Sequence, residues 1–385
     1  MNLMCNVQTD LTWLSENNFD DQGFYICNGQ KFYNKIEAIL YAQKHNLGFD
    51  IKFYFNDNIY NQYQWDQEPN ETLDQLYAKR ARELREKYDY IVVHFSGGYD
   101  SGNILETFAN NNIPVDEVFI RGSISSSKKN ILDTRPENFF AEIFFQSIPL
   151  AEQAKDKYWP DLKITVVDTV PYTLDYWSKN KFWTDAPLLG FFSPGIVWKA
   201  DYDELYPEFK KITESGKKVA HIRGMEKPDI YFDKGRYFVR FLDKFSTIAT
   251  PHSRRENQLP MYHEAFYWAP TTARMIIKQA HMIKKYIKKH KLDPVKFLSG
   301  PRRHEFISTI IYNRTWPILW QTSKPSNDIQ EYDHYFFKDK QSAHYINWKN
   351  GMDHLQAKIN PSWMHNQNIY KGLLGIYSKC YDIGT

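Results

Sequence analysis

The stretch YIVVHFSGGYDSG, residues 90–102, decides how this chain folds. Its first six residues form a short, mainly β-branched and aromatic run, which is typical of a buried parallel strand. The run ends in a turn that contains Gly97 and Gly98. Helical spacing begins after the turn, in the apolar side chains of Ile104, Leu105, Phe108 and Ala109. A strand, a glycine turn and a helix are therefore predicted in direct succession.

A second apolar run, at 115–120, follows this helix. Because two parallel strands joined by a helix need a right-handed crossover, residues 90–120 predict one compact strand-loop-helix-strand unit. Helices and strands are then expected in turn over about 137–157, 164–167, 202–215 and 218–222. This order predicts an α/β fold, in which a parallel sheet carries helices on both faces.

Four parts are expected along the chain. They are a small N-terminal α+β unit at 1–70, the α/β domain at 71–228, a β-hairpin or flap at 229–262, and a mainly helical, aromatic-rich C-terminal region at 263–385. The hairpin is predicted by two alternating runs around Asp233-Lys234-Gly235, a turn sequence that favours positive φ. A helix is expected over 271–290, and the lysines at its end are interpreted as a solvated helix end in preference to a nucleic-acid patch.

The composition excludes several classes of protein. The chain has 385 residues, of which 42% are hydrophobic and 17% aromatic, so it is long enough for two or three globular domains. Subtracting 46 acidic from 49 basic residues leaves +3, which does not by itself indicate nucleic-acid binding. Cys5, Cys27 and Cys380 form no C-x-x-C pair, so neither a disulfide framework nor a zinc ribbon is expected. Without an apolar span or a signal peptide, a cytoplasmic protein with no membrane partner is expected.

The glycine turn has the features of an anion site. Gly97 and Gly98 let backbone N–H groups crowd a point that side chains would otherwise block. Ser96 and Ser101 add hydroxyl donors, and the start of the helix adds unsatisfied N–H groups and the positive end of the helix dipole. Gly102 is expected to keep this surface open. The turn therefore predicts a site for phosphate or pyrophosphate.

Asp100 is an acidic residue beside this expected phosphate site. It can cap the helix or hold Mg²⁺ that the phosphates share. A tight turn with no ligand is the plain alternative, which the combination of strand, paired serines, aspartate and helix disfavours. The chain contains neither G-x-x-x-x-G-K-[ST] nor G-x-G-x-x-G, which argues against a P-loop NTPase and a dinucleotide-binding fold.

Residues 96–101, which follow a hydrophobic strand, match the S-G-G-x-D-S signature of the PP-loop, or N-type ATP pyrophosphatase, superfamily. The resemblance covers roughly residues 88–225 and implies a HUP-like α/β fold. This superfamily includes the synthetase domain of asparagine synthetase, tRNA-lysidine and GMP synthetases, a 7-deazaguanine nitrile synthase and phosphoadenylylsulfate reductases. The flanks resemble uncharacterised asparagine-synthase-like proteins.

The resemblance implies both a site and a reaction. In such enzymes the loop holds the β- and γ-phosphates of ATP, a substrate oxygen attacks the α-phosphate, and an amine or a sulfur then displaces AMP. For this chain the resemblance implies that ATP and Mg²⁺ bind at Ser96, Gly97, Gly98, Tyr99, Asp100 and Ser101. It also places the end of the next strand, at Ile120 and Arg121, where family members contact adenine through the backbone.

A second loop, residues 222–228, closes another predicted parallel strand. Ligands of open α/β sheets bind at the carboxyl ends of strands, so this loop is expected on the same rim as the first. Lys227 or Arg223 is expected to neutralise charge at the α-phosphate, and Glu226 to bind the metal or the incoming amine. An ordinary charged turn stiffened by Pro228 is the alternative.

Other polar residues carry weaker expectations. Three basic residues of a Ser-rich loop either close over ATP or are solvated, namely Lys128, Lys129 and Arg135. Three histidines lack ligand-like spacing and are interpreted as structural or surface residues, namely His252, His263 and His281. Residues 65–69 either line the pocket or anchor a linker.

The branch of the superfamily depends on the source of nitrogen or sulfur. Asparagine synthetase takes ammonia from glutamine with a cysteine that follows the initiator Met, whereas this chain begins Met1-Asn2, so no such glutaminase domain is expected. Cys380 lies near the C-terminus, as in sulfonucleotide reductases, but lacks their Glu-Cys-Gly context.

The function expected from these features is that of an ATP-dependent, adenylate-forming ligase or amidotransferase-like enzyme. It would cleave ATP to AMP and pyrophosphate and transfer an amine or ammonia to a small-molecule or modified-base acceptor. The alternatives are a sulfur-transferring, PAPS-reductase-like enzyme and a nucleotide-binding protein without catalysis. The identity of the acceptor, nucleic-acid binding and assembly into a homo-oligomer are left open.

Overall fold

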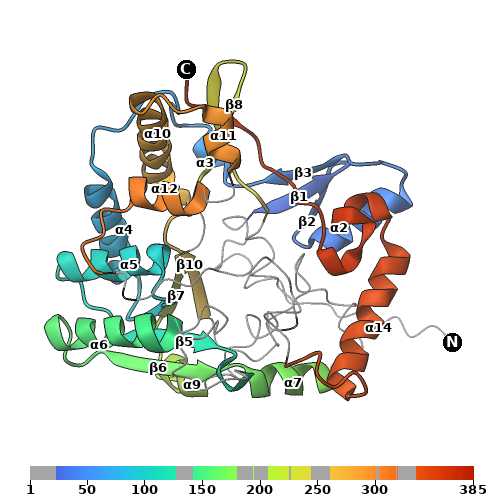
Figure 1. Ribbon diagram of the computed structural model, residues 1–385, viewed down its shortest axis with the longest axis horizontal. Helices are drawn as coiled ribbons and strands as arrows, with labels where there is room; N and C mark the ends of the chain where they lie inside the picture. Colours follow the sequence, from blue (N-terminus) through green and yellow to red (C-terminus); the bar gives the residue numbers. More distant parts are fainter. Residues whose placement is uncertain are drawn as a thin grey trace.

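A sheet of five parallel strands, in the left half of Figure 1, is the largest sheet among the described residues. The computed structural model describes residues 23–126, 142–179, 194, 207–224, 227–243, 261–300, 303–317, 319 and 335–385. In spatial order the strands are β10 (Met261–Ala265), β7 (Val219–Arg223), β4 (Tyr90–His94), β5 (Glu117–Gly122) and β6 (Lys163–Asp168). The predicted α/β fold with a parallel sheet is therefore confirmed.

Helices cover both faces of this sheet. Ile91 and Val93 of β4 join the main core, on the face that is covered by α4 (Leu73–Lys87), α5 (Tyr99–Asn110) and α6 (Ile148–Lys157). Val92 points the other way, as the alternation of a strand requires, and packs with Phe209 of α9 (Pro207–Glu214). Because both faces are buried, β4 is apolar at almost every position.

The structure differs from the predicted elements in three places. The helix expected over 137–157 consists, in the described residues, of a π-helical turn η3 (Ile143–Ser147) followed by α6. Strand β5 continues to Gly122, where it still pairs with Asp168 of β6. Strand β10 has no counterpart among the predicted strands, because its short sequence MYHEA lacks a clear period and its partner β7 lies far away in the sequence.

A second, antiparallel sheet lies near the N-terminus, with the order β2 (Gln30–Phe32), β1 (Phe24–Cys27), β3 (Ile51–Tyr54). Helix α2 (Lys35–Lys44) packs on it and begins where the side chain of Asn34 accepts the backbone N–H groups of Ile36 and Glu37. A short helix, α3 (Asp57–Tyr60), leads on towards α4. The described residues from 23 to 60 thus contain both strands and helices.

The predicted hairpin is part of a third sheet. Its strands are β8 (Asp229–Asp233) and β9 (Arg236–Arg240), and both Lys234 and Gly235 of the turn have positive φ. A strand from the end of the chain, β11 (Tyr381–Asp382), pairs with β9. The hairpin is therefore a sheet and not a free flap.

The described part of the C-terminal region is mainly helical. Its described helices are η7 (Pro270–Thr272), α10 (Ala273–Lys289), α11 (Pro294–Ser299), α12 (Arg303–Ile311), α14 (Ala343–Lys358), η8 (Pro361–Trp363), η9 (His365–Gln367) and η10 (Ile369–Lys371). Helix α14 packs along α7 (Val170–Lys179), where Asn347 donates to the carbonyl oxygen of Trp177 at 2.8 Å. A short helix, η2 (Ile124–Ser126), follows β5.

One hydrophobic cluster runs through the three sheets and the C-terminal helices. The N-terminal sheet unit and the hairpin sheet are also joined by a buried ion pair between Lys35 of α2 and Asp243, which follows β9, at 2.7 Å.

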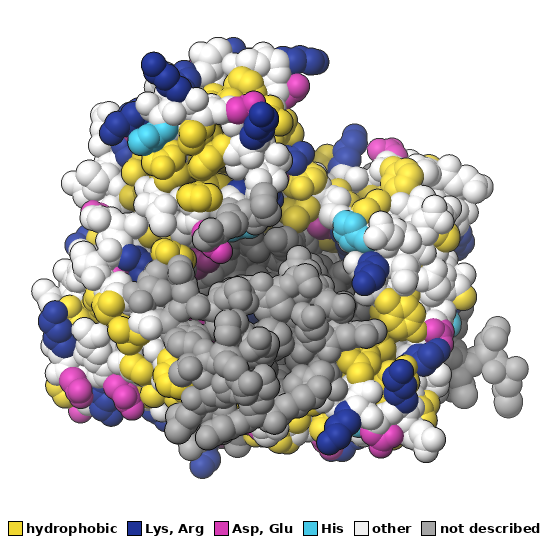
Figure 2. All heavy atoms as spheres, in the orientation of Figure 1, with side chains coloured by type: hydrophobic (Ala, Val, Ile, Leu, Met, Phe, Trp, Pro, Cys, Tyr) yellow, Lys and Arg dark blue, Asp and Glu magenta, His cyan; other side chains and the backbone are white. Residues whose placement is uncertain are grey.

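Apolar side chains are exposed in the upper left of Figure 2, and Val295 of α11 and Phe306 of α12 are among the exposed apolar residues. In the described residues, no helix is both long enough and apolar enough to cross a membrane.

Candidate functional site

The carboxyl ends of β4 and β7 meet where the strand order of the parallel sheet reverses. The chain passes from β4 to β5 and β6 on one side and then returns to β7 on the other side of β4. Connections that leave neighbouring strands in opposite directions open a crevice, and ligands of open α/β sheets bind there. The loop at 96–101, called the S-G-G loop below, follows β4. Of the predicted loop at 222–228, Ile222 and Arg223 belong to β7, and the described residues Gly224, Lys227 and Pro228 come after it. Both predicted loops therefore lie at this switch point.

The S-G-G loop is a tight turn closed by its own serines. Gly97 has φ +74°, in the region that favours glycine. The backbone N–H of Ser96 donates to the Ser101 hydroxyl at 3.1 Å, and the two hydroxyl oxygens lie 3.2 Å apart. Gly98 then caps α5 with an extended backbone. The chain thus passes from the strand into the helix without a long connection.

The first turn of α5 presents backbone N–H groups at this crevice. The N–H of Gly102 bonds back to the carbonyl oxygen of Gly98 at 2.9 Å, as in a regular helix. The N–H groups of Tyr99, Asp100 and Ser101 precede it and so have no acceptor within the helix. Together with the helix dipole, they form the kind of N-terminus that binds anions.

Asp100 is held by two side chains from distant parts of the chain. Lys227 Nζ lies 2.8 Å from Oδ1 and 2.9 Å from Oδ2. The hydroxyl of Tyr312 donates to Oδ1 at 2.6 Å. The Lys227 side chain is 8% exposed and the Asp100 side chain 29% exposed, so the pair lies at the edge of the solvent. The structure therefore brings together two residues for which the sequence predicts a catalytic role.

Buried tyrosines surround the start of α5. The hydroxyl of Tyr267 donates to the carbonyl oxygen of Asp100 at 2.9 Å and accepts from Asn103 at 3.0 Å. Burial raises the pKa of Tyr267 and of Tyr312 well above the ordinary value, and the nearby charge of Asp100 adds to the effect. Both hydroxyls therefore stay protonated and act as hydrogen-bond donors.

Arg223 lies on the opposite face of the sheet from α5. It is the last residue of β7, and the alternation of the strand puts it on the same face as His221, whose ring packs against Phe209 of α9 at 4.6 Å. Burial, with the charges of Arg223 and Arg121 as smaller causes, lowers the pKa of His221 to about 3. The structure thus separates Arg223 from Lys227, although the sequence predicts the same role for both.

The remaining predicted residues are placed as follows. Ile120 is buried within β5 and pairs with Val166 of β6, so it lies inside the strand and not at its end. Arg121 is half-buried in the same strand. Several predictions fall outside the described residues, namely those for Glu226, Lys128, Lys129, Arg135 and His252.

Two glycines mark close approaches to the start of α5. A Cβ atom at Gly224 would lie 3.0 Å from the carbonyl carbon of Asp100 and 3.1 Å from the nitrogen of Ser101, so the loop after β7 packs directly on the S-G-G loop. A Cβ atom at Gly102 would lie 2.5 Å from Cζ of Arg314. The expectation that Gly102 keeps an open surface is therefore wrong, because a guanidinium group covers it.

Four residues that the sequence analysis missed contact the S-G-G loop and Asp100. They are Gln146, Tyr267, Tyr312 and Arg314. A signal for such partners exists in Glu106, which interrupts the apolar positions of α5. It is buried and accepts the backbone N–H groups of Thr315 at 2.6 Å and Trp316 at 3.2 Å. A buried carboxylate needs donors, but the sequence does not say which segment supplies them.

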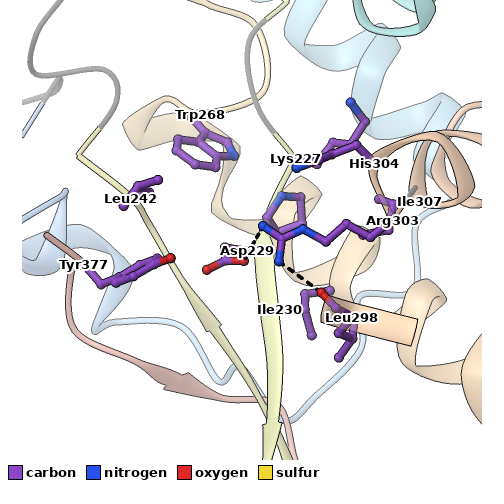
Figure 3. Close-up of a pocket in the computed structure, with 11 residues that line it drawn as sticks. Lys227, Asp229, Ile230, Leu242, Trp268, Leu298, Arg303, His304, Ile307 and Tyr377 are labelled. Carbon is purple, nitrogen blue, oxygen red and sulfur yellow. Dashed lines mark hydrogen bonds and ion pairs between the residues drawn. The ribbon is translucent and has the colours of Figure 1, made fainter. Parts of the chain in front are cut away.

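Lys227 is also one of the residues that line a cavity (Figure 3). The volume of this cavity is about 30 Å³, which is room for about one or two water molecules. Asp229, Arg303 and Tyr377 turn their polar ends towards one another in it, and Leu242 and Trp268 form an apolar wall. Asp229 is also held by Arg240, whose Nε lies 2.9 Å from Oδ2. Lys227 is thus shared by the S-G-G loop and this cavity.

Other sequence candidates have structural contacts. His281 is buried, and its Nε2 lies 2.9 Å from the carbonyl oxygen of Trp65, which agrees with a structural histidine. The Trp65 ring stacks on Tyr381 at 4.2 Å, so it anchors the linker and does not line the site. On α10, Lys278 pairs with Glu68 at 2.8 Å, so part of the basic helix surface is used inside the protein.

Within the described parts of the chain, no group of three or more His, Cys, Asp or Glu side chains could hold a metal ion. Cys27 is buried in β1, where burial raises the pKa of its thiol, and Cys380 is exposed next to the hairpin residue Tyr231.

No protein-family model matches the chain, and no curated protein matches it.

Proposed function

We propose that this chain binds ATP at the S-G-G loop and cleaves it between the α- and β-phosphates, as an adenylate-forming ligase of the PP-loop type with a HUP-like fold. The position of the loop carries the proposal. It lies at the switch point of a parallel sheet, it opens a helix, and the side chain of Lys227 reaches it from the neighbouring strand end. A helix N-terminus and a converging cation favour a polyanion such as the phosphates of a nucleotide.

The residues of the loop would divide the work as follows. The N–H groups of Tyr99, Asp100 and Ser101 hold the β- and γ-phosphates, and the serine hydroxyls add donors. An oxygen of the acceptor forms a bond to the α-phosphorus while the bond to the bridging oxygen breaks, and the electron pair leaves with pyrophosphate. Lys227 neutralises the charge that develops there. An amine or ammonia then displaces AMP from the adenylated acceptor.

Mg²⁺ is compatible with the donors at this site. Asp100 offers one carboxylate, and Mg²⁺ in nucleotide sites usually binds through one or two carboxylates together with phosphate oxygens. When bound, it supplies further neutralisation of phosphate charge. Because Lys227 bonds to both oxygens of Asp100, we expect it to exchange this carboxylate for phosphate oxygens when the nucleotide binds.

The acceptor would bind beside Lys227, which contacts the loop and also lines the small cavity of Figure 3. Asp229 and Arg303 give this cavity both signs of charge, and Trp268 gives it a flat apolar wall. With a volume of about 30 Å³ the cavity itself is too small for an acceptor, so the acceptor is left unnamed.

The product of ATP cleavage tests the proposal. With candidate acceptors, the protein should release AMP and pyrophosphate and should exchange labelled pyrophosphate into ATP. Asp100→Asn should lower the exchange rate by about 100-fold, the usual size of an electrostatic contribution to catalysis. Asp175→Asn, at an exposed carboxylate of α7 paired with Lys179, is the matched control and should leave the rate unchanged. Release of ADP, or equal rates in the two variants, would exclude the proposed reaction.

The contact between Asp100 and Lys227 also favours a second candidate, a nucleotide-binding protein without catalysis. In that case the lysine stays on the carboxylate and no metal is needed. ATP binding that is the same with Mg²⁺ and with a chelator, together with no AMP release, would support this candidate. Sulfur transfer has less support, since Cys27 lies in the N-terminal sheet and Cys380 beside the hairpin.

A further inference from the structure

Two side chains from outside the S-G-G loop bind two consecutive carbonyl oxygens of the loop. Gln146 Nε2 donates to the carbonyl oxygen of Gly97 at 3.0 Å. Arg314 Nη1 donates to the carbonyl oxygen of Gly98 at 3.1 Å. Gln146 is 1% exposed and the Arg314 side chain 6% exposed, so both bonds are shielded from water.

These bonds fix the direction of two N–H groups. In a planar trans peptide the carbonyl and the following N–H point in opposite directions. A bond to the carbonyl oxygen of Gly97 therefore sets the N–H of Gly98, and a bond to that of Gly98 sets the N–H of Tyr99. The N–H of Gly98 donates to the Ser96 hydroxyl at 3.4 Å, whereas the N–H of Tyr99 has no acceptor within the helix.

The two side chains are themselves held by one segment of the C-terminal region. The side-chain oxygen Oε1 of Gln146 accepts the backbone N–H of Leu319 at 2.5 Å. Arg314 Nε lies 3.9 Å from Glu106 Oε2 in a buried ion pair. Glu106 in turn accepts the N–H of Thr315 at 2.6 Å. The loop is thus held by Arg314, Thr315 and Leu319, more than 200 positions further along the chain.

The glycines of the loop are explained by the same contacts. A Cβ atom at Gly97 would lie 2.6 Å from Cγ of Gln146, and one at Gly102 would lie 2.5 Å from Cζ of Arg314. Any side chain at these positions would displace Gln146 or Arg314. Glycine at 97 and 102 therefore makes room for protein side chains, in addition to the access for phosphate that the sequence predicts.

We propose that Gln146 and Arg314 are positioning residues that hold the peptide planes of the S-G-G loop, so that its N–H groups are aimed at an anion before the anion arrives. This inference rests on the phosphate-binding function proposed above. A preorganised set of donors binds more tightly because the loop loses less conformational freedom on binding.

The test measures loop order and anion affinity separately in the full chain. Hydrogen exchange is followed in a peptide that covers residues 96–105, which includes the bonded N–H of Gly102, and pyrophosphate binding is followed by calorimetry. In Arg314→Ala the exchange should be about tenfold faster and pyrophosphate about tenfold weaker, the size expected for one buried hydrogen bond. Arg314→Lys should recover part of both, because the ammonium can still donate to Gly98. The control Arg82→Ala, at an exposed arginine of α4 that donates to Asn111, should change neither.

Gly102→Ala provides a second variant that keeps every hydrogen-bonding group. It should reproduce both effects by displacing the guanidinium, and it should add less than about twofold in an Arg314→Ala background, since residues in contact are not additive. Unchanged exchange in Arg314→Ala and Gly102→Ala would overturn the positioning role, whether or not affinity falls. Faster exchange in both variants of a protein that does not bind pyrophosphate would keep the positioning role and remove the proposed function.

Discussion

Replacing Gly97 by alanine should separate backbone strain from crowding at the S-G-G loop. Gly97 has φ +74°, and a Cβ atom there would lie 2.6 Å from Cγ of Gln146 and 3.0 Å from the hydroxyl of Ser147. Gly235, in the hairpin turn, has a similar φ of +81° but nothing within 4 Å of the position of its Cβ. The two sites share the strain and differ in the crowding.

The expected magnitudes follow from these two terms. Left-handed backbone at a residue with a Cβ atom costs roughly 1–2 kcal/mol, which applies to both variants. Forcing an extra atom into packed surroundings costs roughly 1–3 kcal/mol more, which applies only to Gly97→Ala. We therefore expect a loss of about 2–5 kcal/mol for Gly97→Ala and about 1–2 kcal/mol for Gly235→Ala.

Urea unfolding at pH 7 measures both free energies, and calorimetry measures ATP affinity in the folded variants. Gly97→Ala should also weaken ATP binding, because Gln146 can no longer hold the carbonyl oxygen of Gly97 in the same place. Gly235→Ala should bind ATP as the wild type does. Equal losses of stability in the two variants would refute the crowding argument and with it the described contact between Gln146 and the loop.

Three further predictions concern other parts of the chain. Asp243→Asn should cost about 3–5 kcal/mol in urea unfolding, because it leaves the charge of Lys35 buried without its partner, and a loss under 1 kcal/mol would contradict this. The pKa of His221 is lowered from 6.5 to about 3. Between these pH values the unfolded chain binds a proton that the folded chain does not. The contribution of His221 to the free energy of unfolding is therefore fully present above pH 6.5 and is lost as the pH falls towards 3. From pH 7 to pH 5 the wild type should therefore lose about 2 kcal/mol more than His221→Gln, and parallel pH profiles would rule this out. Gly224→Ala should weaken ATP binding, since its Cβ would lie 3.0 Å from the backbone of Asp100, and calorimetry showing unchanged affinity would count against the contact.

Local patterns predicted most of the parallel sheet. The run at 90–95 is apolar because both of its faces are buried, and the helix after it keeps its period because one face meets the sheet. Strand β10 was not predicted from the sequence. Its five residues have no clear period, and its pairing with β7 depends on a partner about forty residues earlier in the sequence.

The candidate site could be predicted only in part for the same reason. Glycines, serines and an aspartate between a strand and a helix indicate an anion site by themselves, since each acts on its neighbours in the chain. The sequence could not separate the roles of Lys227 and Arg223, because it does not show where the strand ends. In the structure Arg223 is the last residue of β7 and lies on the face that α9 covers. Lys227 lies beyond the strand end and contacts Asp100.

The sequence by itself determined the α/β class and the glycine turn that is predicted to bind phosphate. Both depend on periodicity and on residues that are close together in the chain. The tertiary structure alone decided the strand order, and with it the switch point at β4 and β7. It also decided that Gln146, Tyr312 and Arg314 surround the loop. These contacts join residues 49 to 216 positions apart, so they are set by packing of the whole core, and no local pattern encodes them.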